Sequence, residues 1–314
     1  MNNNRPVAII GAGSIGIAFA LVFARAGFTV HIYDPDEIMR NKALPSLLAR
    51  LGDLETFSLL DEKVESVAAR VAIFEDQSLA VASSQLVMEC APEKVEVKRH
   101  IFSQLDLQTP ADCILASASS AIPASHFTAS LPGRERCLIA HPGNPPYLIP
   151  VIEIVPAPWT SVQTIREAIA RFKTALMHPV LVQKEVEGFI FNRLQGAVLR
   201  EAYSLIHDGV ASVEDIDTVM TNGLGLRWSV IGPFETADLN TRGGIVSHAE
   251  KMGPAYMRIG AERGDRSTWP PELVATVNSA RRRVLPLENW ESRVAWRDRQ
   301  LMALLQFRKN NKTR

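Results

Sequence analysis

One histidine and one glutamate stand out in a stretch that is otherwise apolar or rich in proline, IAHPGNPPYLIPVIEIV at residues 139–155. The strand-like segments around His141 and Glu153 predict burial, and a buried ionisable group costs free energy unless it has a partner. The simplest partner of each is the other. A histidine oriented by a carboxylate can act as a general base, although either residue alone is more often structural. We therefore predict that His141 and Glu153 form an acid–base pair.

A glycine-rich motif near the N-terminus has the residue types that bind a dinucleotide. GAGSIG follows the apolar run VAII and opens an apolar helical pattern, so its context is strand, turn and helix. In such a loop the glycines allow the tight turn, the approach of the backbone to a pyrophosphate and close packing of helix on strand. The helix N-terminus then faces the phosphates. The predicted residues of this loop are Gly11, Gly13, Ser14, Ile15 and Gly16.

Asp34, directly after the strand-like TVHIY segment, bears on the choice of cofactor. Its carboxylate would accept hydrogen bonds from the adenosine ribose hydroxyls and would repel a 2′-phosphate. No arginine stands beside it in the sequence, so the pattern favours NAD over NADP. The alternative interpretation is a glycine-rich turn followed by a surface aspartate.

Two further candidates lie in ECAPEKVEVKRHIF, residues 89–102, which starts at a strand end and turns into a helix. Glu93 and Lys98 would lie near the crevice outside the carboxyl ends of the strands, where ligands bind in open α/β sheets. This position makes both residues candidates for cofactor binding. A solvated helix residue is an equally good interpretation of each.

The elements that must position these residues alternate between strand and helix. Apolar strand candidates recur at VAII (7–10), TVHIY (29–33), LVMEC (86–90), CILAS (113–117), CLIA (137–140), VIEIV (151–155) and PVLVQ (179–183). Residues 37–70 have a helical pattern, and helical segments lie between most of the strand candidates. The alternation predicts an α/β fold with a Rossmann-type, doubly wound and mostly parallel sheet that is covered on both faces.

Strand signals stop after residue 183. FIFNRLQGAVLREAYSLIHDG, residues 189–209, has the pattern of one long helix that ends at a glycine, and the rest of the chain is helical or loop-like in pattern. We predict a domain boundary near Glu187 and Gly188. An NAD-binding domain would span residues 1–187, and an all-helical domain that binds substrate and forms a dimer would span residues 188–314.

Composition excludes several classes of partner. Lys plus Arg and Asp plus Glu are both 34 among 314 residues, so no bulk charge attracts nucleic acid or an anionic membrane surface. The uncharged stretch after Arg5 contains glycines that argue against a signal peptide, and no stretch has a clean transmembrane length. The 3 cysteines lack paired spacing, which favours a reducing cytoplasm and argues against a metal site.

The motifs together resemble the 3-hydroxyacyl-CoA dehydrogenase superfamily, and within it most closely the branch of gulonate dehydrogenases. The matching pieces are GAGSIG, ECAPEKVEVKRHIFSQLD, the serine pair before IPAS, AHPGNPPYLIPVIEIVP, VQKEVEGFIFNRLQ and NGLGLRWSVIGPFET, which span most of the chain. The resemblance implies that His141 and Glu153 are catalytic together with Asn192 of the FIFNRL segment. It also implies a serine, which is Ser120 when counted back from His141 and Ser119 when the serine pair is aligned.

The resemblance implies an NAD-dependent dehydrogenase in which the histidine takes the proton of a substrate hydroxyl while hydride leaves the adjacent carbon. We expect a small L-3-hydroxy acid as substrate. The segment GLGLRWSVIGPFE has the pattern of a loop that carries Arg227, and the guanidinium of Arg227 can bind a free carboxylate. The alternative is a surface arginine that lies on Trp228 or pairs with a neighbouring acid. The alternatives are a 3-hydroxyacyl-CoA substrate and a non-catalytic NAD-binding protein, since one family member serves as a lens crystallin.

In relatives the helical domain pairs two subunits, so the resemblance also implies a homodimer. The long apolar helix at 189–206 and the three tryptophans at 269, 290 and 296 are consistent with such an interface. The alternative is that the tryptophans pack only within their own domain.

Overall fold

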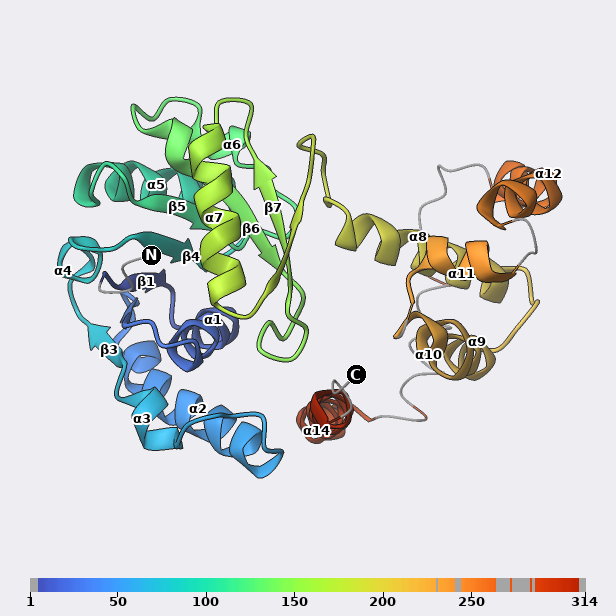
Figure 1. The fold of residues 1–314 in the computed structure, drawn as a ribbon, viewed down its shortest axis with the longest axis horizontal. Coiled ribbons are helices and arrows are strands. Elements are labelled where there is room, and N and C mark those ends of the chain that lie inside the picture. The colour runs from blue at the N-terminus through green and yellow to red at the C-terminus, as the bar shows by residue number, and fades with distance from the viewer. Residues whose placement is uncertain are drawn as a thin grey trace. The chain divides into compact units, whose positions relative to one another are not determined.

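The computed structural model describes residues 5–229, 231–240, 244–263 and 286–310, together with residues 272 and 283. The chain divides into two compact units, one of Met1–Arg193 with Val294–Arg314 and the other of Leu194–Arg293. All of the described strands belong to the first unit, as Figure 1 shows. The two units therefore differ in architecture.

Eight strands of the first unit form one sheet in the order β3-β2-β1-β4-β5-β6-β7-β8. Every neighbouring pair is parallel except β6 and β7, which are antiparallel. The predicted Rossmann-type, doubly wound and mostly parallel sheet is confirmed. The strands are β1 (Val7–Ile10), β2 (Val30–Tyr33), β3 (Val71–Phe74), β4 (Leu86–Glu89), β5 (Ile114–Ser117), β6 (Cys137–Pro142), β7 (Val151–Pro156) and β8 (His178–Leu181).

One strand, β3, is absent from the sequence-based prediction. It is a four-residue apolar run, VAIF, at the edge of the sheet, where it pairs only with β2. It comes shortly after the predicted helical region of residues 37–70, which contains helices α2 (Glu37–Thr56) and α3 (Val64–Ala68). So short an apolar run cannot be told from the end of a helix by periodicity alone.

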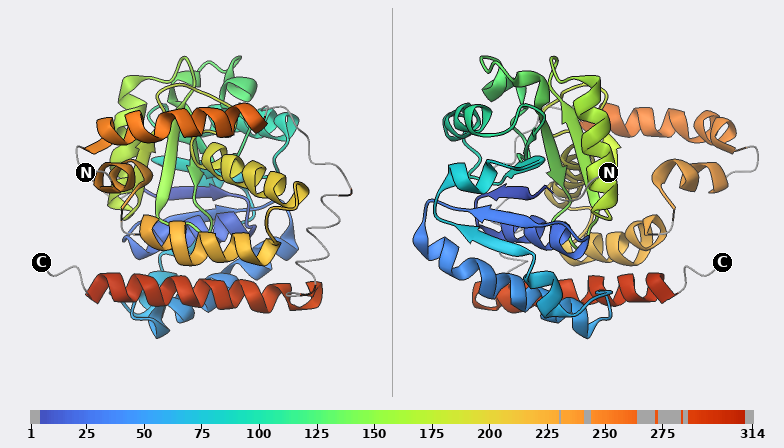
Figure 2. Two further views of the ribbon diagram at one scale, coloured as in Figure 1. Left: turned by 90° about the vertical axis from the view of Figure 1, so that its right-hand side faces the viewer. Right: turned by 60° about the vertical axis from the view of Figure 1, so that its left-hand side comes forward.

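Helices cover both faces of the sheet, and each face has its own hydrophobic core (Figures 1 and 2). Successive residues of β1 point to opposite faces, so Val7 and Ile9 enter one core while Ala8 and Ile10 enter the other. The first core contains side chains of α1 (Ser14–Arg25), α2, α3 and α7 (Val162–Thr174). The second contains side chains of α4 (Gln77–Val81), α5 (Val95–Gln108) and α6 (Ser125–Thr128).

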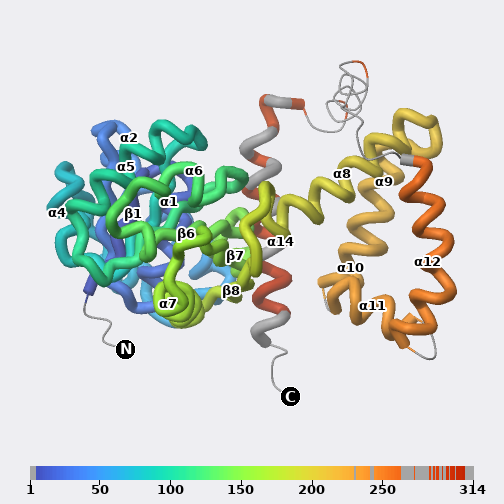
Figure 3. The backbone as a smooth tube through the Cα atoms, turned by 90° about the horizontal axis from the view of Figure 1, so that it is seen from above, coloured from blue at the N-terminus to red at the C-terminus, as the bar shows by residue number. Residues whose placement is uncertain are grey.

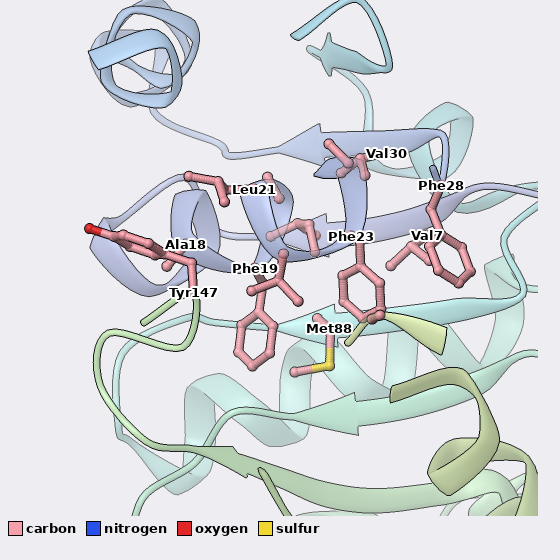
Figure 4. Close-up of a cluster of buried hydrophobic side chains, with 14 of the residues drawn as sticks. Val7, Ala18, Phe19, Leu21, Phe23, Phe28, Val30, Met88 and Tyr147 are labelled. Carbon is pink, nitrogen blue, oxygen red and sulfur yellow. The ribbon is translucent and has the colours of Figure 1, made fainter. Parts of the chain in front are cut away.

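Helix α1 is the most deeply buried helix of the first core. Its residues 16–24 are all buried, which explains why its sequence is apolar all round. Figure 4 shows Phe19, Phe23 and Phe28 in this cluster, with Tyr147 beside Ala18. The Phe23 ring contacts that of Phe28 at 5.6 Å between centroids. The core therefore fixes the helix whose first turn contains the second half of the glycine-rich motif.

In the part of the second unit that the structure describes, the regular elements are all helices. Figure 3 traces them as a tube in chain order. They are α8 (Phe191–His207), which starts in the first unit, α9 (Val213–Val219), the π-helix η2 (Met220–Leu224), α10 (Gly225–Trp228), α11 (Pro233–Asn240) and α12 (Gly244–Arg263). The helix predicted for residues 189–209 is α8, and Gly209 follows it with a φ of 68°. The predicted all-helical C-terminal domain is confirmed over these residues.

The end of the chain returns to the first unit. Helix α14 (Trp290–Asn310) follows the 3-10 helix η3 (Leu287–Asn289), and its Met302 is buried in the first core. A second 3-10 helix, η1 (Arg134–Arg136), precedes β6.

The predicted domain limits of 1–187 and 188–314 stay a prediction. Of the three tryptophans, Trp269 and the side chain of Trp290 lie outside the described residues, and Trp296 is partly exposed on α14.

Among the described residues, none of the helices has the length and apolar character needed to cross a membrane.

Candidate active site

The glycine-rich loop has the geometry of a phosphate-binding turn. Gly11 has a φ of 108°, a left-handed value that disfavours a side chain. A Cβ on Gly16 would lie 1.8 Å from the carbonyl oxygen of Gly11, so only glycine allows α1 to approach this close. Within the described ranges of the chain, a Cβ on Gly13 would meet nothing within 4 Å, and no side chain caps the first turn of α1. The open space beside uncapped helical N–H groups fits a pyrophosphate.

Asp34 follows β2 at the same edge of the sheet and is held by two backbone donors. Its Oδ2 accepts from the N–H of Ala12 at 2.7 Å, and its Oδ1 accepts from the N–H of Asp36 at 2.9 Å. The expectation that no arginine stands beside it needs correction. Arg40 folds back from the first turn of α2, and its Nη1 donates to the carbonyl oxygen of Asp34 at 2.9 Å. The electrostatic preference against a 2′-phosphate therefore rests on the carboxylate of Asp34 alone.

Arg50 is a residue of this region that sequence reasoning missed. Its Nη1 donates to the carbonyl oxygen of Ser14 at 2.9 Å, and its Nη2 donates to the Ser14 Oγ at 3.0 Å. The same guanidinium lies 5.7 Å from the ring centroid of Tyr147, in the loop after β6. No local signal marks this contact, because the arginine lies on α2, far along the chain from both partners. Arg50 thus links the glycine-rich loop to the loop that follows His141.

Lys98 is not the exposed crevice residue that its helical position suggested. Its side chain is 1% exposed, and its Nζ donates to both carboxylate oxygens of Glu89, at 3.1 and 3.0 Å, and to Ser117 Oγ at 3.3 Å. Glu89 and Ser117 are the last residues of β4 and β5. The ammonium group is thereby enclosed beneath the carboxyl edge of the sheet, and a contact of Lys98 with the cofactor stays a prediction.

Glu93 organises the turn that carries the two candidate serines. Its Oε1 accepts from Ser119 Oγ at 2.6 Å and from the backbone N–H groups of Ser120, Ala121 and Ile122 at 3.1–3.3 Å. Burial by itself would raise the pKa of Glu93, but the hydrogen bonds from Ser119 and the backbone lower it below the ordinary value. The carboxylate therefore stays ionised and fixes the turn.

His141 and Glu153 meet as their positions in the sequence predicted. They lie opposite each other in the antiparallel pair of β6 and β7, and both are buried. His141 Nδ1 lies 2.7 Å from Glu153 Oε2. Within the part of the chain that the structure describes, Nε2 of His141 has no hydrogen-bond partner. The pair thus has one nitrogen fixed by a carboxylate and one that can meet a substrate.

The second oxygen of Glu153 holds the start of α8. Oε1 accepts from the backbone N–H groups of Ile190 and Phe191 at 2.7 and 2.9 Å. Burial raises the pKa of Glu153, but the hydrogen bonds from His141, Phe191 and Ile190 lower it below its usual value. Glu153 therefore remains a carboxylate at neutral pH, as a partner that favours a protonated imidazole must.

Asn192 joins α8 to the serine turn. Its Nδ2 donates to the backbone carbonyl oxygen of Ser120 at 2.9 Å. Ser120 is exposed, whereas the Ser119 hydroxyl is buried and bonded to Glu93 and to the backbone of Ile122. The structure brings both serines and Asn192 together, and the choice of the catalytic serine stays a prediction.

Arg227 belongs to the second compact unit. The segment GLGLRWSVIGPFE, residues 223–235, was expected to be a loop, but its first six residues are helical. They complete the π-helix η2 and form α10, which follows η2 without a break. Arg227 lies on α10 and its side chain is exposed. Its role in binding a carboxylate stays a prediction.

A phosphate-binding glycine loop and a buried histidine–glutamate pair on one Rossmann sheet are features of nicotinamide-dependent dehydrogenases that act on CH–OH groups. Residues 6–186 match the NAD-binding domain of 3-hydroxyacyl-CoA dehydrogenase, and residues 188–282 match its C-terminal domain. The chain belongs to the 3-hydroxyacyl-CoA dehydrogenase family, as its motifs predicted, and its cofactor is NAD.

Three similar proteins illustrate the range of the family. A lambda-crystallin homolog from Bos taurus is 37% identical over 306 residues, covering 96% of this chain and 95% of that protein. An L-carnitine dehydrogenase from Streptomyces griseus is 35% identical, covering 84% and 80%. The solved structure of 5-formyl-3-hydroxy-2-methylpyridine 4-carboxylic acid 5-dehydrogenase, an NAD+ dependent dismutase, has a TM-score of 0.83 at 29% identity and covers 96% of this chain and 98% of its own.

Proposed function

We propose that the protein oxidises the 3-hydroxyl group of a small L-3-hydroxy acid, an acid like L-gulonate with a free carboxylate, by hydride transfer to NAD. The observation that carries the proposal is the His141–Glu153 hydrogen bond of 2.7 Å, which leaves the outer imidazole nitrogen for a substrate hydroxyl. When bound, NAD supplies the hydride acceptor. The protein supplies the base, the donors that orient the substrate, and a rigid site.

His141 accepts the hydroxyl proton at Nε2 as the alcohol is oxidised, and it returns that proton to the ketone oxygen in the reverse direction. Glu153 keeps Nδ1 protonated and stabilises the imidazolium that forms. The low pKa of Glu153 supports this role, because the carboxylate stays charged while the imidazole changes its charge.

Ser120 and Asn192 orient the substrate oxygen in this proposal. The contact between Asn192 Nδ2 and the Ser120 carbonyl places the two residues next to each other, and the exposed position of Ser120 supports it over Ser119. Ser119 remains the alternative, since substrate binding could redirect its hydroxyl from Glu93. Either serine would donate a hydrogen bond to the oxygen whose charge changes in the reaction.

Two observations support a free acid over a thioester as substrate: the presence of Arg227 and the substrates for which two similar proteins are named. A guanidinium forms two parallel hydrogen bonds with a carboxylate, whereas a thioester has no charge at that position. One relative is named for L-carnitine and a structural neighbour for a pyridine carboxylic acid, both of which carry a carboxylate. The family name supports the alternative substrate, a 3-hydroxyacyl-CoA thioester, and the lambda-crystallin relative supports NAD binding without turnover.

The test compares kcat/KM for L-gulonate, L-3-hydroxybutyrate and L-carnitine with that for 3-hydroxybutyryl-CoA, in the native protein and in Arg227→Met. The free acids should be preferred. The variant should lose about 1–3 kcal/mol of transition-state binding for free acids, the scale of a charged hydrogen bond, and little for the thioester. Arg258→Met, which removes an exposed arginine from α12 of the same unit, is the matched control and should change neither.

Three outcomes would contradict the proposal in different ways. A higher kcat/KM for the thioester, unaffected by Arg227→Met, would replace the small acid with an acyl-CoA. NAD binding without turnover of any of these compounds would support the crystallin-like alternative. Equal losses in Arg227→Met and Arg258→Met would remove Arg227 from the site.

The proposal includes a homodimer in the cytoplasm. Large apolar side chains are exposed on the helices of the second unit, among them Leu194, Leu226, Phe234, Val246 and Met257. So many exposed apolar residues on one unit support burial against a second copy. Sedimentation equilibrium tests this part of the proposal, and a monomer at micromolar concentration would refute it.

A further inference from the structure

Phe189 combines an unfavourable backbone conformation with complete burial. Its φ is 51°, in the left-handed region that bulky residues rarely adopt, and the preceding Gly188 has a φ of 74°. The side chain is 0% exposed and belongs to the second hydrophobic core. Such a conformation persists only where the surroundings enforce it, and it is found most often at functional sites.

The ring of Phe189 packs against the imidazole of His141. Their centroids are 5.5 Å apart, with an angle of 56° between the ring planes. Phe191 approaches the same imidazole at 6.3 Å and 79°. Glu153 holds the imidazole at Nδ1, so the buried Phe189 ring restrains it by packing while the carboxylate restrains it by hydrogen bonding.

The backbone of the same turn aims two donors at Glu153. The N–H of Phe189 donates to the carbonyl oxygen of Val186 at 3.1 Å, which closes the turn. The next two N–H groups, of Ile190 and Phe191, both donate to Glu153 Oε1. Because Gly188 and Phe189 reverse the chain with left-handed φ values, helix α8 begins with these donors facing the carboxylate.

We propose that Phe189 is a positioning residue for the acid–base pair, acting through the imidazole of His141 by its ring and through the carboxylate of Glu153 by the turn that it occupies. This inference rests on the proposed function, because it concerns the same proton transfer. It assigns no contact between Phe189 and substrate or cofactor. A small displacement of a general base is enough to lower the rate strongly, so a turn that holds both members of the pair affects the rate.

The experiment compares Phe189→Leu with Phe102→Leu, a matched control that shortens another fully buried phenylalanine of the same core without touching His141. Phe189→Leu should lower kcat about tenfold, with KM for NAD within about twofold of the native value. Phe102→Leu should lower stability but leave kcat unchanged. A kcat for Phe189→Leu equal to that of the control would overturn the proposal.

A double-mutant cycle that combines Phe189→Leu with Glu153→Gln tests whether Phe189 acts through the acid–base pair or only packs in the core. If Phe189 acts through the pair, its substitution should have a much smaller effect on kcat when Glu153 is already replaced, because interacting residues are not additive. Fully additive losses would count against the proposal.

A measurement on the cofactor-free protein separates this inference from the proposed function. The hydrogen-bonded Nδ1–H of His141 should give a resolved proton NMR signal in native protein and in Phe102→Leu, and a broadened or lost signal in Phe189→Leu. An unchanged signal in Phe189→Leu would overturn the inference even if the enzyme oxidises L-3-hydroxy acids. If none of the substrates is oxidised while the signal is lost in Phe189→Leu as expected, the proposed function is rejected. The inference that Phe189 positions His141 then still holds.

Discussion

Two buried ionisable pairs lie on the same sheet and differ in one respect. Lys98 donates to both carboxylate oxygens of Glu89, which also accepts from Ser117 and from the N–H of Ala91, and the Lys98 ammonium lies 3.5 Å from Glu93 Oε2 on its other side. His141 and Glu153 are also buried, but among the residues that the structure describes the imidazole bonds through only one of its two nitrogens. The first pair is closed, whereas the second leaves a proton-accepting atom for a ligand.

The difference shows that burial and pairing alone do not identify a catalytic group. Both pairs stand near the carboxyl ends of strands, where ligands of open α/β sheets bind. A closed pair resists change, since loss of one partner leaves an uncompensated buried charge. An open pair can change its protonation state while keeping its geometry. Substitutions in the two pairs should therefore affect different quantities.

The largest effect is expected for His141→Ala. Removing the base should lower kcat by roughly 10² to 10⁴, the usual contribution of a positioned acid or base. Because the glycine-rich loop and Asp34 belong to the β1–α1–β2 unit, whereas His141 lies on β6, binding of NAD should be preserved. Steady-state kinetics and fluorescence titration with NADH measure the two quantities. Near-native turnover would show that another group moves the proton. The His141–Glu153 pair would then be structural, like the Lys98–Glu89 pair.

Lys98→Met should mainly lower the stability of the fold, whereas His141→Ala mainly lowers kcat. The variant leaves Glu89 buried without its cation, which should lower the free energy of unfolding by about 3–5 kcal/mol. Urea denaturation of the native protein and the variant measures this free energy of unfolding. The double variant Glu89→Leu/Lys98→Met should recover much of the loss, because apolar replacement of a whole buried pair is often neutral. A stable Lys98→Met protein with a raised KM for NAD would instead make Lys98 a cofactor ligand, as its position in the sequence first suggested.

Local patterns predicted most of the nucleotide half of the site. The glycine loop and Asp34 are set by contacts within one strand–helix–strand unit, so spacing alone predicts their roles. The opposition of His141 and Glu153 followed from two strand-like segments joined by a short loop. The helix that contains Asn192 was also predicted, but its exact start was not.

The features that the sequence did not predict depend on contacts between distant segments. Arg50 reaches Ser14 from another helix, and Arg40 folds back onto the carbonyl of Asp34. The burial of Lys98 depends on Glu89, a single carboxylate at a strand end with no distinctive local pattern. The left-handed φ of Phe189 has no signature in its own residue type, since only the preceding glycine suggests a turn.

The smallest and most diagnostic effect is expected for Glu153→Gln, which keeps the shape of the pair and removes its charge. Glu153 has a lowered pKa and is a carboxylate at neutral pH, so its negative charge favours the protonated imidazole. Without that charge, the protonated imidazole loses the carboxylate that stabilises it. The acidic limb of log kcat/KM against pH should therefore move to lower pH, by about one unit or more.

The amide cannot reproduce every contact of the carboxylate, and this sets the expected size of the rate loss. Glu153 accepts from His141 with one oxygen and from Ile190 and Phe191 with the other, whereas a glutamine has only one oxygen that can accept. One side of the arrangement must lose its hydrogen bonds, so kcat should fall as well, but less than in His141→Ala. Glu167→Gln is the matched control, since Glu167 also has a lowered pKa but pairs with Arg171 on α7. If the acidic limb stays in place in Glu153→Gln, or moves equally in Glu167→Gln, the charge of Glu153 does not act on His141 and the open pair is no more than a structural hydrogen bond.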